Sequence, residues 1–365
     1  MTTAPQDPSA EERPPDDGTF LALLVHHAYL DREAAQGLLA RCREGEALDR
    51  LVGEALELDA EQVARLRRTR CGERPEIPGH RLERRLGQGG TADVWEAVEL
   101  SSRRRLALKI LRPEVARDGA QLRAFVAEAK LLTKLEHEGL VQCFGAARAG
   151  DTYLMRLECI DGRTLLEHLD AGETFDERRA LEIVLDVARV LAHLEAHAVV
   201  HRDIKPGNLM LSREGRTVLI DLGFAAGLDA AATGEHAAGT RAYLSPEEAR
   251  GAAVADARSD IYSLGVTLFQ LLTGHLPYDG DDDEELLAKA IFAELDSPEL
   301  RGRGVSPHLQ YFIEKMMAKD ADDRYQSWAE LIGDFEAQLR GREALKRPQE
   351  PRGTRPRSTR RRRLR

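Results

Sequence analysis

Hydrophobic and polar positions along the chain predict two different kinds of structure. Residues 81–110 alternate in the manner of strands around a cluster of glycines, which predicts a small antiparallel sheet. Residues 118–136 instead repeat apolar side chains at helical spacing, with Phe125, Ala129 and Leu132 on one face. Farther along the chain helical patterns dominate. We therefore expect a small sheet followed by a largely helical region.

An internal repeat precedes the predicted sheet. The apolar pattern of residues 23–38 recurs in residues 51–66, and each copy contains a Leu-Asp-x-Glu step. The Asp of such a step can cap the next helix, and its Glu lies in the first turn of that helix. Residues 19–70 are therefore predicted to form two helical hairpins. They serve either as an extension that packs on its neighbour or as a module that docks a protein partner.

Three segments lack the periodicity of packed elements. Residues 1–18 are rich in Pro, Asp and Glu and are predicted to be disordered. Residues 71–79 contain two prolines and are predicted to be a linker. Residues 341–365 are rich in Pro and Arg, and we expect a disordered basic tail. The tail either stays solvated or binds weakly to an anionic surface, whether lipid or nucleic acid.

Charge and cysteine content limit the classes of function. The formal net charge is −10, and an acidic body argues against wholesale binding of nucleic acid. The N-terminus lacks the order of a secretory signal, and polar residues interrupt the longest apolar stretch, residues 261–272. We therefore predict a buried helix there, no transmembrane segment and a cytoplasmic protein. The cysteines have no CxxC spacing and are expected to be reduced thiols: Cys42, Cys71, Cys143 and Cys159.

The segment 201–208, with the sequence HRDIKPGN, carries the strongest chemical signal. Asp203 is placed to accept a proton from an attacking hydroxyl, or to orient it, and Asn208 can bind a magnesium ion. Asp221 ends an apolar run and either caps a turn or completes the oxygen-rich metal site. The alternative for the whole segment is a structural loop held by a buried His201 beside an Arg–Asp ion pair.

A glycine cluster and an isolated lysine predict phosphate binding in the sheet. Residues 86–94, LGQGGTADV, place glycines at a strand turn, where backbone can lie close over phosphates, although such hairpins are as often only tight turns. Lys109 lies on an apolar strand, where its ammonium requires an anion. Glu128, on the following helix, supplies a carboxylate; without Lys109 it would read as a solvated helix charge.

The order and approximate spacing of five polar residues resemble those of the eukaryotic-type protein kinase superfamily, most closely its bacterial serine/threonine kinases. These residues are Lys109, Glu128, Asp203, Asn208 and Asp221. The resemblance implies an α+β class, a two-lobed kinase fold and ATP and Mg²⁺ as cofactors. It implies these boundaries within the kinase domain at 80–340: a β-rich N-lobe at 80–157, a hinge at 158–161 and a helical C-lobe at 162–340.

The resemblance also implies roles for individual residues. Asp203 would be the catalytic base, Lys205 would steady the γ-phosphate, and Lys109 would contact the α- and β-phosphates while paired with Glu128. The implied metal ligands are Asn208 and Asp221. The implied nucleotide-binding positions are Leu86, Gly87, Gln88, Gly89, Gly90, Val94, Ala107, Leu157, Glu158, Ile160 and Met210.

Further residues resemble structural and specificity marks of the same superfamily. Glu247 would pair with Arg324, and Asp260 would brace the catalytic loop from a buried helix. Lys205 and Thr240 are marks of serine/threonine rather than tyrosine specificity.

Regulation is less well marked. Arg202, before the catalytic Asp, is typical of kinases whose activation segment is ordered by a phosphate, but Ala226 stands where related bacterial kinases usually carry an Arg. Thr233 is the only residue with a side-chain hydroxyl in the segment 222–239, so it is the candidate autophosphorylation site. The alternative is a segment that orders without phosphate.

The sequence therefore predicts an ATP- and Mg²⁺-dependent serine/threonine kinase that acts on protein substrates in bacterial signalling. Two alternatives remain: a pseudokinase scaffold, and a small-molecule phosphotransferase of the same fold. The catalytic polar residues argue against the first, and residues 239–247, which resemble a peptide-facing loop, argue against the second.

Overall fold

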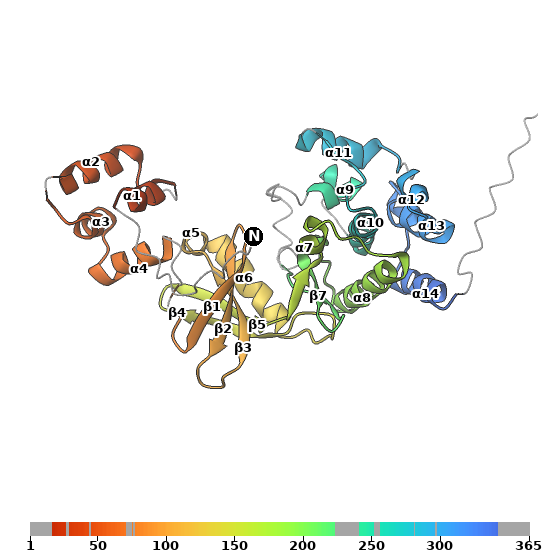
Figure 1. Cartoon of the computed structure of the whole chain (residues 1–365), viewed down its shortest axis with the longest axis horizontal. Helices are drawn as coiled ribbons and strands as arrows, with labels where there is room; N and C mark the ends of the chain where they lie inside the picture. Colours follow the sequence, from red (N-terminus) through yellow and green to blue (C-terminus); the bar gives the residue numbers. More distant parts are fainter. Residues whose placement is uncertain are drawn as a thin grey trace, which may run out of the picture. The chain divides into compact units, whose positions relative to one another are not determined.

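The computed structural model divides the chain into two compact units (Figure 1). The first unit comprises residues 1–129 and 143–159, and the second comprises residues 130–142 and 160–365. The structure describes residues 17–26, 29–43, 45–70, 75, 77–222, 241–251, 256–280, 282–295 and 298–341.

Four helices open the first unit and pack on one another: α1 (Asp17–His26), α2 (Arg32–Arg43), α3 (Leu48–Leu56) and α4 (Ala60–Arg70). Their apolar faces form a core that includes the fully buried Phe20, Leu24, Leu51, Val52 and Val63. We call these helices the helical module. Helix α1 packs against α2, and α3 packs against α4, as two helical hairpins would.

The repeated Asp residues cap helices as the sequence predicts. Asp31 Oδ1 accepts a hydrogen bond of 2.7 Å from the backbone N–H of Ala34, and Asp59 Oδ1 accepts one of 2.8 Å from that of Gln62. Each bond satisfies a donor in the first turn of a helix that would otherwise lack a partner. The two copies of the repeat therefore start their second helix in the same way.

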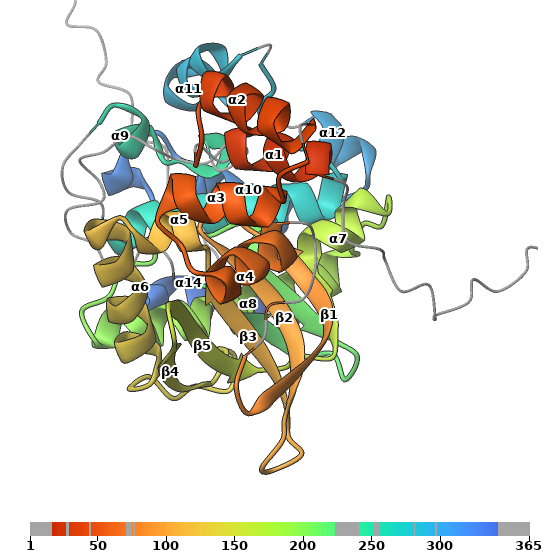
Figure 2. The ribbon, with the colours of Figure 1, turned by 90° about the vertical axis from the view of Figure 1, so that its left-hand side faces the viewer.

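An antiparallel sheet of order β1-β2-β3-β5-β4 forms the rest of the first unit. Trp95, Leu106, Leu108 and Leu154 belong to its buried core. Helix α6 lies beside the sheet (Figures 1 and 2), and it is shorter than the helix predicted over 118–136. The elements are β1 (His80–Gln88), β2 (Ala92–Glu99), β3 (Arg105–Leu111), α5 (Pro113–Ala116), α6 (Gly119–Leu132), β4 (Cys143–Ala149) and β5 (Thr152–Glu158).

The second unit is largely helical, with a three-stranded sheet of order β6-β7-β8. Its strands are β6 (Gly162–Thr164), β7 (Leu209–Ser212) and β8 (Thr217–Leu219). Its helices are α7 (Leu165–Asp170), α8 (Glu177–Ala196), η1 (Pro206–Asn208), η3 (Arg241–Tyr243), α9 (Pro246–Ala249), α10 (Ala257–Thr273), α11 (Asp283–Phe292), α12 (Pro298–Gly302), α13 (Pro307–Met316), η4 (Ala321–Asp323) and α14 (Trp328–Leu339).

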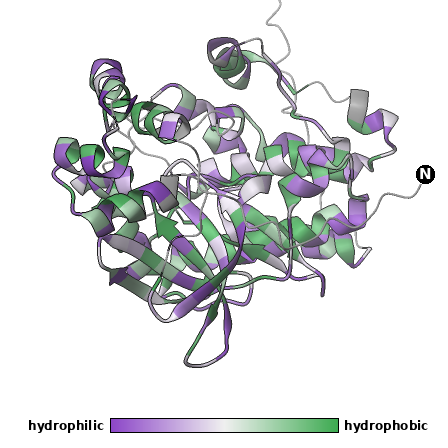
Figure 3. Cartoon of the chain, turned by 60° about the vertical axis from the view of Figure 1, so that its left-hand side comes forward, coloured by the Kyte–Doolittle hydropathy of each residue, from purple (hydrophilic) through white to green (hydrophobic). Residues whose placement is uncertain are grey.

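Helix α10 is the centre of the second unit. Every residue from Ser259 to Thr273 is buried, and α8, α12, α13 and η3 pack against this helix. The predicted buried helix over 261–272 is therefore confirmed. Within the described ranges, no helix is both long and apolar enough to cross a membrane. Hydrophobic and hydrophilic residues instead alternate along most elements (Figure 3), as amphipathic packing requires.

Residues 130–142 belong to the second unit, although we expected residues 80–157 to form one lobe. The reason is backbone pairing with β8. Val141 N–H donates to the Leu219 carbonyl at 2.9 Å, and Leu219 N–H donates to the Gly139 carbonyl at 2.8 Å. These bonds join the segment after α6 to a strand that lies far away in the sequence.

Candidate active site

The first unit carries a buried ion pair between β3 and α6. Lys109 Nζ lies 2.9 Å from Glu128 Oε1, and the side chains are 12% and 6% exposed. Val94 on β2 and Met155 on β5 flank Lys109 in the sheet, so its backbone is fixed on both sides. The pair that the sequence predicts is thus formed, with each charge compensating the other in a poorly solvated place.

The glycine cluster forms the turn between β1 and β2. Gly89 N–H donates to the Ala92 carbonyl at 2.9 Å, and a Cβ on Gly89 would lie 3.1 Å from the same oxygen. Gly87 pairs with Val94 across the strands, and a Cβ on Gly87 or Gly90 would meet nothing within 4 Å. A side chain would therefore be crowded at Gly89, whereas Gly87 and Gly90 leave the backbone accessible.

The predicted adenine-contacting residues of the first unit lie on paired strands. Ala107 of β3 is opposite Leu157 of β5, and both side chains are buried. Glu158 ends β5 opposite Leu106. The chain then enters the second unit between Cys159 and Ile160. In the second unit Met210 lies half-buried on β7.

The segment 201–208 of the second unit, which is the predicted catalytic loop, is held by its own histidine. His201 is fully buried, and its Nδ1 accepts from the Asp203 N–H at 3.2 Å. Its Nε2 then carries the proton and donates to the Asp221 carbonyl at 2.6 Å. Burial lowers the pKa of His201 and so keeps the ring neutral, and the two hydrogen bonds select this tautomer. The ring therefore links the two segments that hold the candidate catalytic and metal-binding carboxylates.

Asp260 of α10 fixes the backbone of the same loop. Its Oδ2 accepts from the His201 N–H at 2.8 Å, and its Oδ1 accepts from the Arg202 N–H at 2.7 Å. Burial raises the pKa of Asp260 to about 7, although both N–H donors favour the carboxylate. Arg202 has a φ of 65°, which is unfavourable for a residue with a Cβ, so these two bonds stabilise a strained position.

Asp203 lies between a cation and an amide. Lys205 Nζ is 2.8 Å from Asp203 Oδ1, while Asn208 Nδ2 donates to Asp203 Oδ2 and to the Asp203 carbonyl, both at 2.8 Å. The two polar contacts fix the carboxylate, which is 7% exposed. Because the Asn208 amide nitrogen is used in this way, its amide oxygen is the atom that remains to bind a cation.

The donor types at Asn208 and Asp221 fit magnesium, which prefers sparse amide and carboxylate oxygens completed by other ligands. Within the described ranges no cluster of three His, Cys, Asp or Glu side chains has the geometry of a metal site.

A family model, described as protein kinase domain, matches residues 80–333. The chain belongs to the protein kinase family. The chain is 34% identical over 259 residues to the serine/threonine-protein kinase PrkC of Bacillus subtilis. The matched region covers 70% of this chain and 40% of PrkC. It is 36% identical over 260 residues to the serine/threonine-protein kinase PknB of Mycolicibacterium smegmatis, covering 68% of this chain and 41% of PknB.

A third relative, a probable serine/threonine-protein kinase of Streptomyces coelicolor, is 36% identical over 267 residues, covering 70% of this chain and 39% of the relative. The chain thus spans less than half the length of these relatives. The matches confirm the predicted superfamily and α+β fold class.

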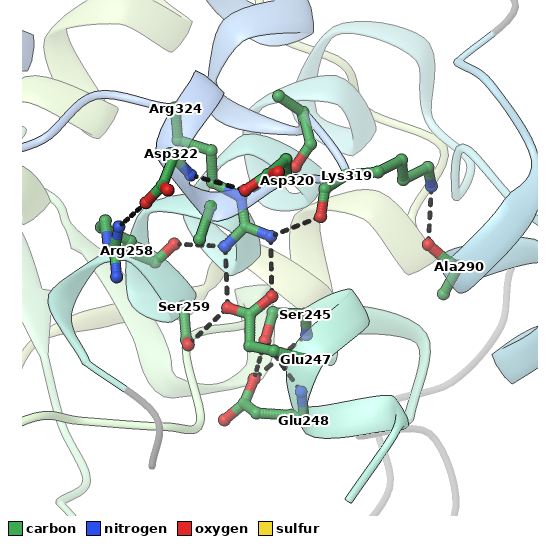
Figure 4. A network of polar contacts seen from close by, with 12 residues as sticks. Ser245, Glu247, Glu248, Arg258, Ser259, Ala290, Lys319, Asp320, Asp322 and Arg324 are labelled. Atoms are coloured by element: carbon green, nitrogen blue, oxygen red, sulfur yellow. Dashed lines mark hydrogen bonds and ion pairs between the residues drawn. The ribbon is translucent and has the colours of Figure 1, made fainter. Parts of the chain in front are cut away.

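A second buried ion pair of the kinase domain joins α9 to the end of η4 (Figure 4). Arg324, 2% exposed, donates from Nη1 to Glu247 Oε1 at 2.8 Å and from Nη2 to Oε2 at 2.7 Å. Ser259 Oγ also donates to Glu247 Oε1 at 2.7 Å. Burial alone would raise the pKa of Glu247, but the hydrogen bonds and charge of Arg324 lower it to about 2.

Some site residues of the kinase domain could not be found from the sequence. Ser259 bonds to Glu247, and Ser263 Oγ donates to the Tyr243 carbonyl at 2.7 Å. A serine at these spacings gives no local sequence signal of its role.

The two candidate regulatory threonines, Thr233 and Thr240, lie in 223–240, outside the described residues.

Proposed function

We propose that this protein is a serine/threonine kinase that transfers the γ-phosphoryl group of ATP to Ser and Thr hydroxyls of protein substrates. The arrangement that supports this most directly is Asp203 held between Lys205 and Asn208 at 2.8 Å from each. A fixed carboxylate beside a cation and an amide oxygen suits the orientation of a hydroxyl next to phosphate.

Each residue then has a defined part in the reaction. Asp203 orients the acceptor hydroxyl and takes its proton, while Lys205 offsets charge on the transferred phosphoryl group. Lys109, positioned by Glu128, holds the α- and β-phosphates. Bound Mg²⁺, held by the amide oxygen of Asn208 and by Asp221, would supply positive charge to the nucleotide phosphates.

The substitution Asp203→Asn tests the proposal. In an assay with a generic protein substrate and labelled ATP, we expect it to reduce phosphoryl transfer by more than about a hundredfold while ATP binding stays within about twofold. Asp151→Asn, at an exposed ion pair with Arg148, is the matched control and should be neutral.

The same assay distinguishes the alternatives. Wild-type protein that binds ATP but transfers no phosphate would favour a pseudokinase scaffold. Transfer to a small molecule but to no protein would favour a small-molecule phosphotransferase. Either result would exclude the proposed activity.

We also propose that Thr233 is autophosphorylated and that Arg202 binds the phosphate. Arg202 Nε is buried and makes no hydrogen bond within the described part of the chain, so an anionic partner would satisfy it. Mass spectrometry of active protein should detect phosphorylated Thr233, and Thr233→Ala should slow turnover. Full activity of protein that is not phosphorylated at Thr233 would exclude this role. Thr240 is the second position at which phosphorylation should be sought.

The flanking segments have proposed partners as well. The helical module, with its own core, would dock a protein, and the Arg-rich tail at 341–365 would bind anionic surfaces weakly. Among the described cysteines, Cys42, Cys143 and Cys159 form no disulfide, which supports a cytoplasmic location.

A further inference from the structure

Lys319, between α13 and η4, directs its ammonium group at two neutral oxygens. Nζ donates to the Tyr278 hydroxyl at 2.9 Å and to the backbone carbonyl of Ala290, on α11, at 2.6 Å. Figure 4 shows the side chain extending away from the Arg324–Glu247 pair toward Ala290. Nζ also lies 4.3 Å from the centre of the Tyr278 ring and 5.9 Å from that of Tyr262.

The charges around Lys319 disfavour its protonated form. Within the described ranges its hydrogen-bond acceptors carry no charge, and the charged groups that act on it are the cations Arg324 and Arg250. Burial, together with repulsion from these two arginines, lowers the pKa of Lys319 to about 8. A neutral amine can keep both donated hydrogen bonds and still present its lone pair.

Two other lysines of the same unit lack this combination. Lys315 lies 3.9 Å from the centre of the Tyr325 ring, but its Nζ is 2.6 Å from Glu330 Oε1. Lys289 pairs with Glu285 and Asp279, and these contacts raise its pKa. Lys315 thus resembles Lys319 in its aromatic contact and differs by a carboxylate, which makes it a matched control.

We propose that Lys319 is a site of Nε-acylation by acyl phosphates, the simplest being acetyl phosphate. The neutral amine attacks the carbonyl carbon, an N–C bond forms and the C–O bond to phosphate breaks. Inorganic phosphate leaves with the electron pair of that bond, and the amine proton passes to solvent or to the departing phosphate. The product is an uncharged amide with a single N–H.

Acylation changes the contacts of α11. One N–H can satisfy either Tyr278 or the Ala290 carbonyl but not both, and the acyl group adds volume beside the end of this helix. Helix α11 packs against η3 and α9, and both of these elements overlap residues 239–247, the stretch that resembles a peptide-facing loop. We therefore expect acylation to raise the KM for protein substrate and to change the affinity for ATP little. This expected effect on KM rests on the proposed kinase activity, whereas the modification itself does not.

The test incubates the full chain with acetyl phosphate at several pH values between 7 and 9 and measures acylation site by site by peptide mass spectrometry. At pH 7.5 we expect Lys319 to react about tenfold faster than Lys315 or Lys289, because its larger neutral fraction outweighs its lower basicity. Its rate should level off above its pKa. Equal rates at the three lysines, or an unmodified Lys319, would overturn the proposal.

Two variants separate the causes. Arg250→Gln removes an exposed cation that repels the ammonium, so Lys319 acylation at pH 7.5 should fall about twofold. An unchanged or faster rate would contradict the electrostatic explanation. Repeating the labelling on Asp203→Asn should give the same Lys319 preference. Labelling therefore tests the modification even if the protein is not an active kinase.

Discussion

Arg324 binds Glu247 through two parallel hydrogen bonds, of 2.8 Å and 2.7 Å, with the arginine almost completely buried. Glu247→Gln leaves this guanidinium without its counter-charge. We expect the free energy of unfolding to fall by about 3 kcal/mol, measured by urea denaturation. Glu336→Gln, at the exposed pair with Arg189, should change it by less than about 1 kcal/mol. Equal effects of the two substitutions would refute the importance of burial.

The same pair predicts a pH dependence. Arg324 lowers the pKa of Glu247 to about 2 from an ordinary value of 4.5, so the folded state binds fewer protons than the unfolded state between these values. The stabilisation is therefore complete above about pH 5 and is lost as pH falls toward 2. The stability difference between wild type and Glu247→Gln should shrink over that window, and a constant difference would contradict the assignment.

Asp260→Asn should disturb the catalytic loop. The carboxylate accepts from two backbone N–H groups, whereas an amide presents an NH₂ to one of them. We expect unfolding free energy to fall by about 2 kcal/mol and kcat to fall more than the affinity for ATP. Calorimetry and steady-state kinetics would measure both. A variant with wild-type kcat would show that the loop does not depend on this brace.

Glu128→Gln should impair nucleotide handling. Lys109 then loses the carboxylate that lies 2.9 Å from its Nζ in a position that is only 12% exposed, so its ammonium is less well positioned. We expect kcat/KM for ATP to drop by about tenfold to a hundredfold. Glu99→Gln, which alters a pair with Arg156 in the same sheet, is the control and should stay within about twofold.

Gly89→Ala and Gly90→Ala should differ in stability. A Cβ at Gly89 meets the Ala92 carbonyl at 3.1 Å, whereas one at Gly90 meets nothing within 4 Å. We expect Gly89→Ala to reduce the unfolding free energy by about 1 kcal/mol and Gly90→Ala to change it by less than about 0.5 kcal/mol. Thermal unfolding of the two variants compares them directly. The reverse order would show that the turn relaxes around the new methyl group.

Local sequence patterns predicted much of the fold. The repeat with its Asp caps, the strands around the glycine cluster and the buried α10 each follow from a short stretch of sequence, because caps and periodicity act over a few residues. The end of α6 was predicted too far along the chain. Residues 130–142 join the second unit through pairing with Leu219, which no local pattern indicates.

The sequence by itself determined which chemical groups this protein has and their order: Lys109, Glu128, Asp203, Asn208 and Asp221. Only the tertiary structure decided how the catalytic-loop backbone is held and which side chains have shifted pKa values. The neutral tautomer of His201, the two N–H bonds to Asp260 and the lowered pKa of Lys319 arise between residues distant in sequence. Burial and the charges of folded neighbours set these properties, and neither exists until the chain is packed.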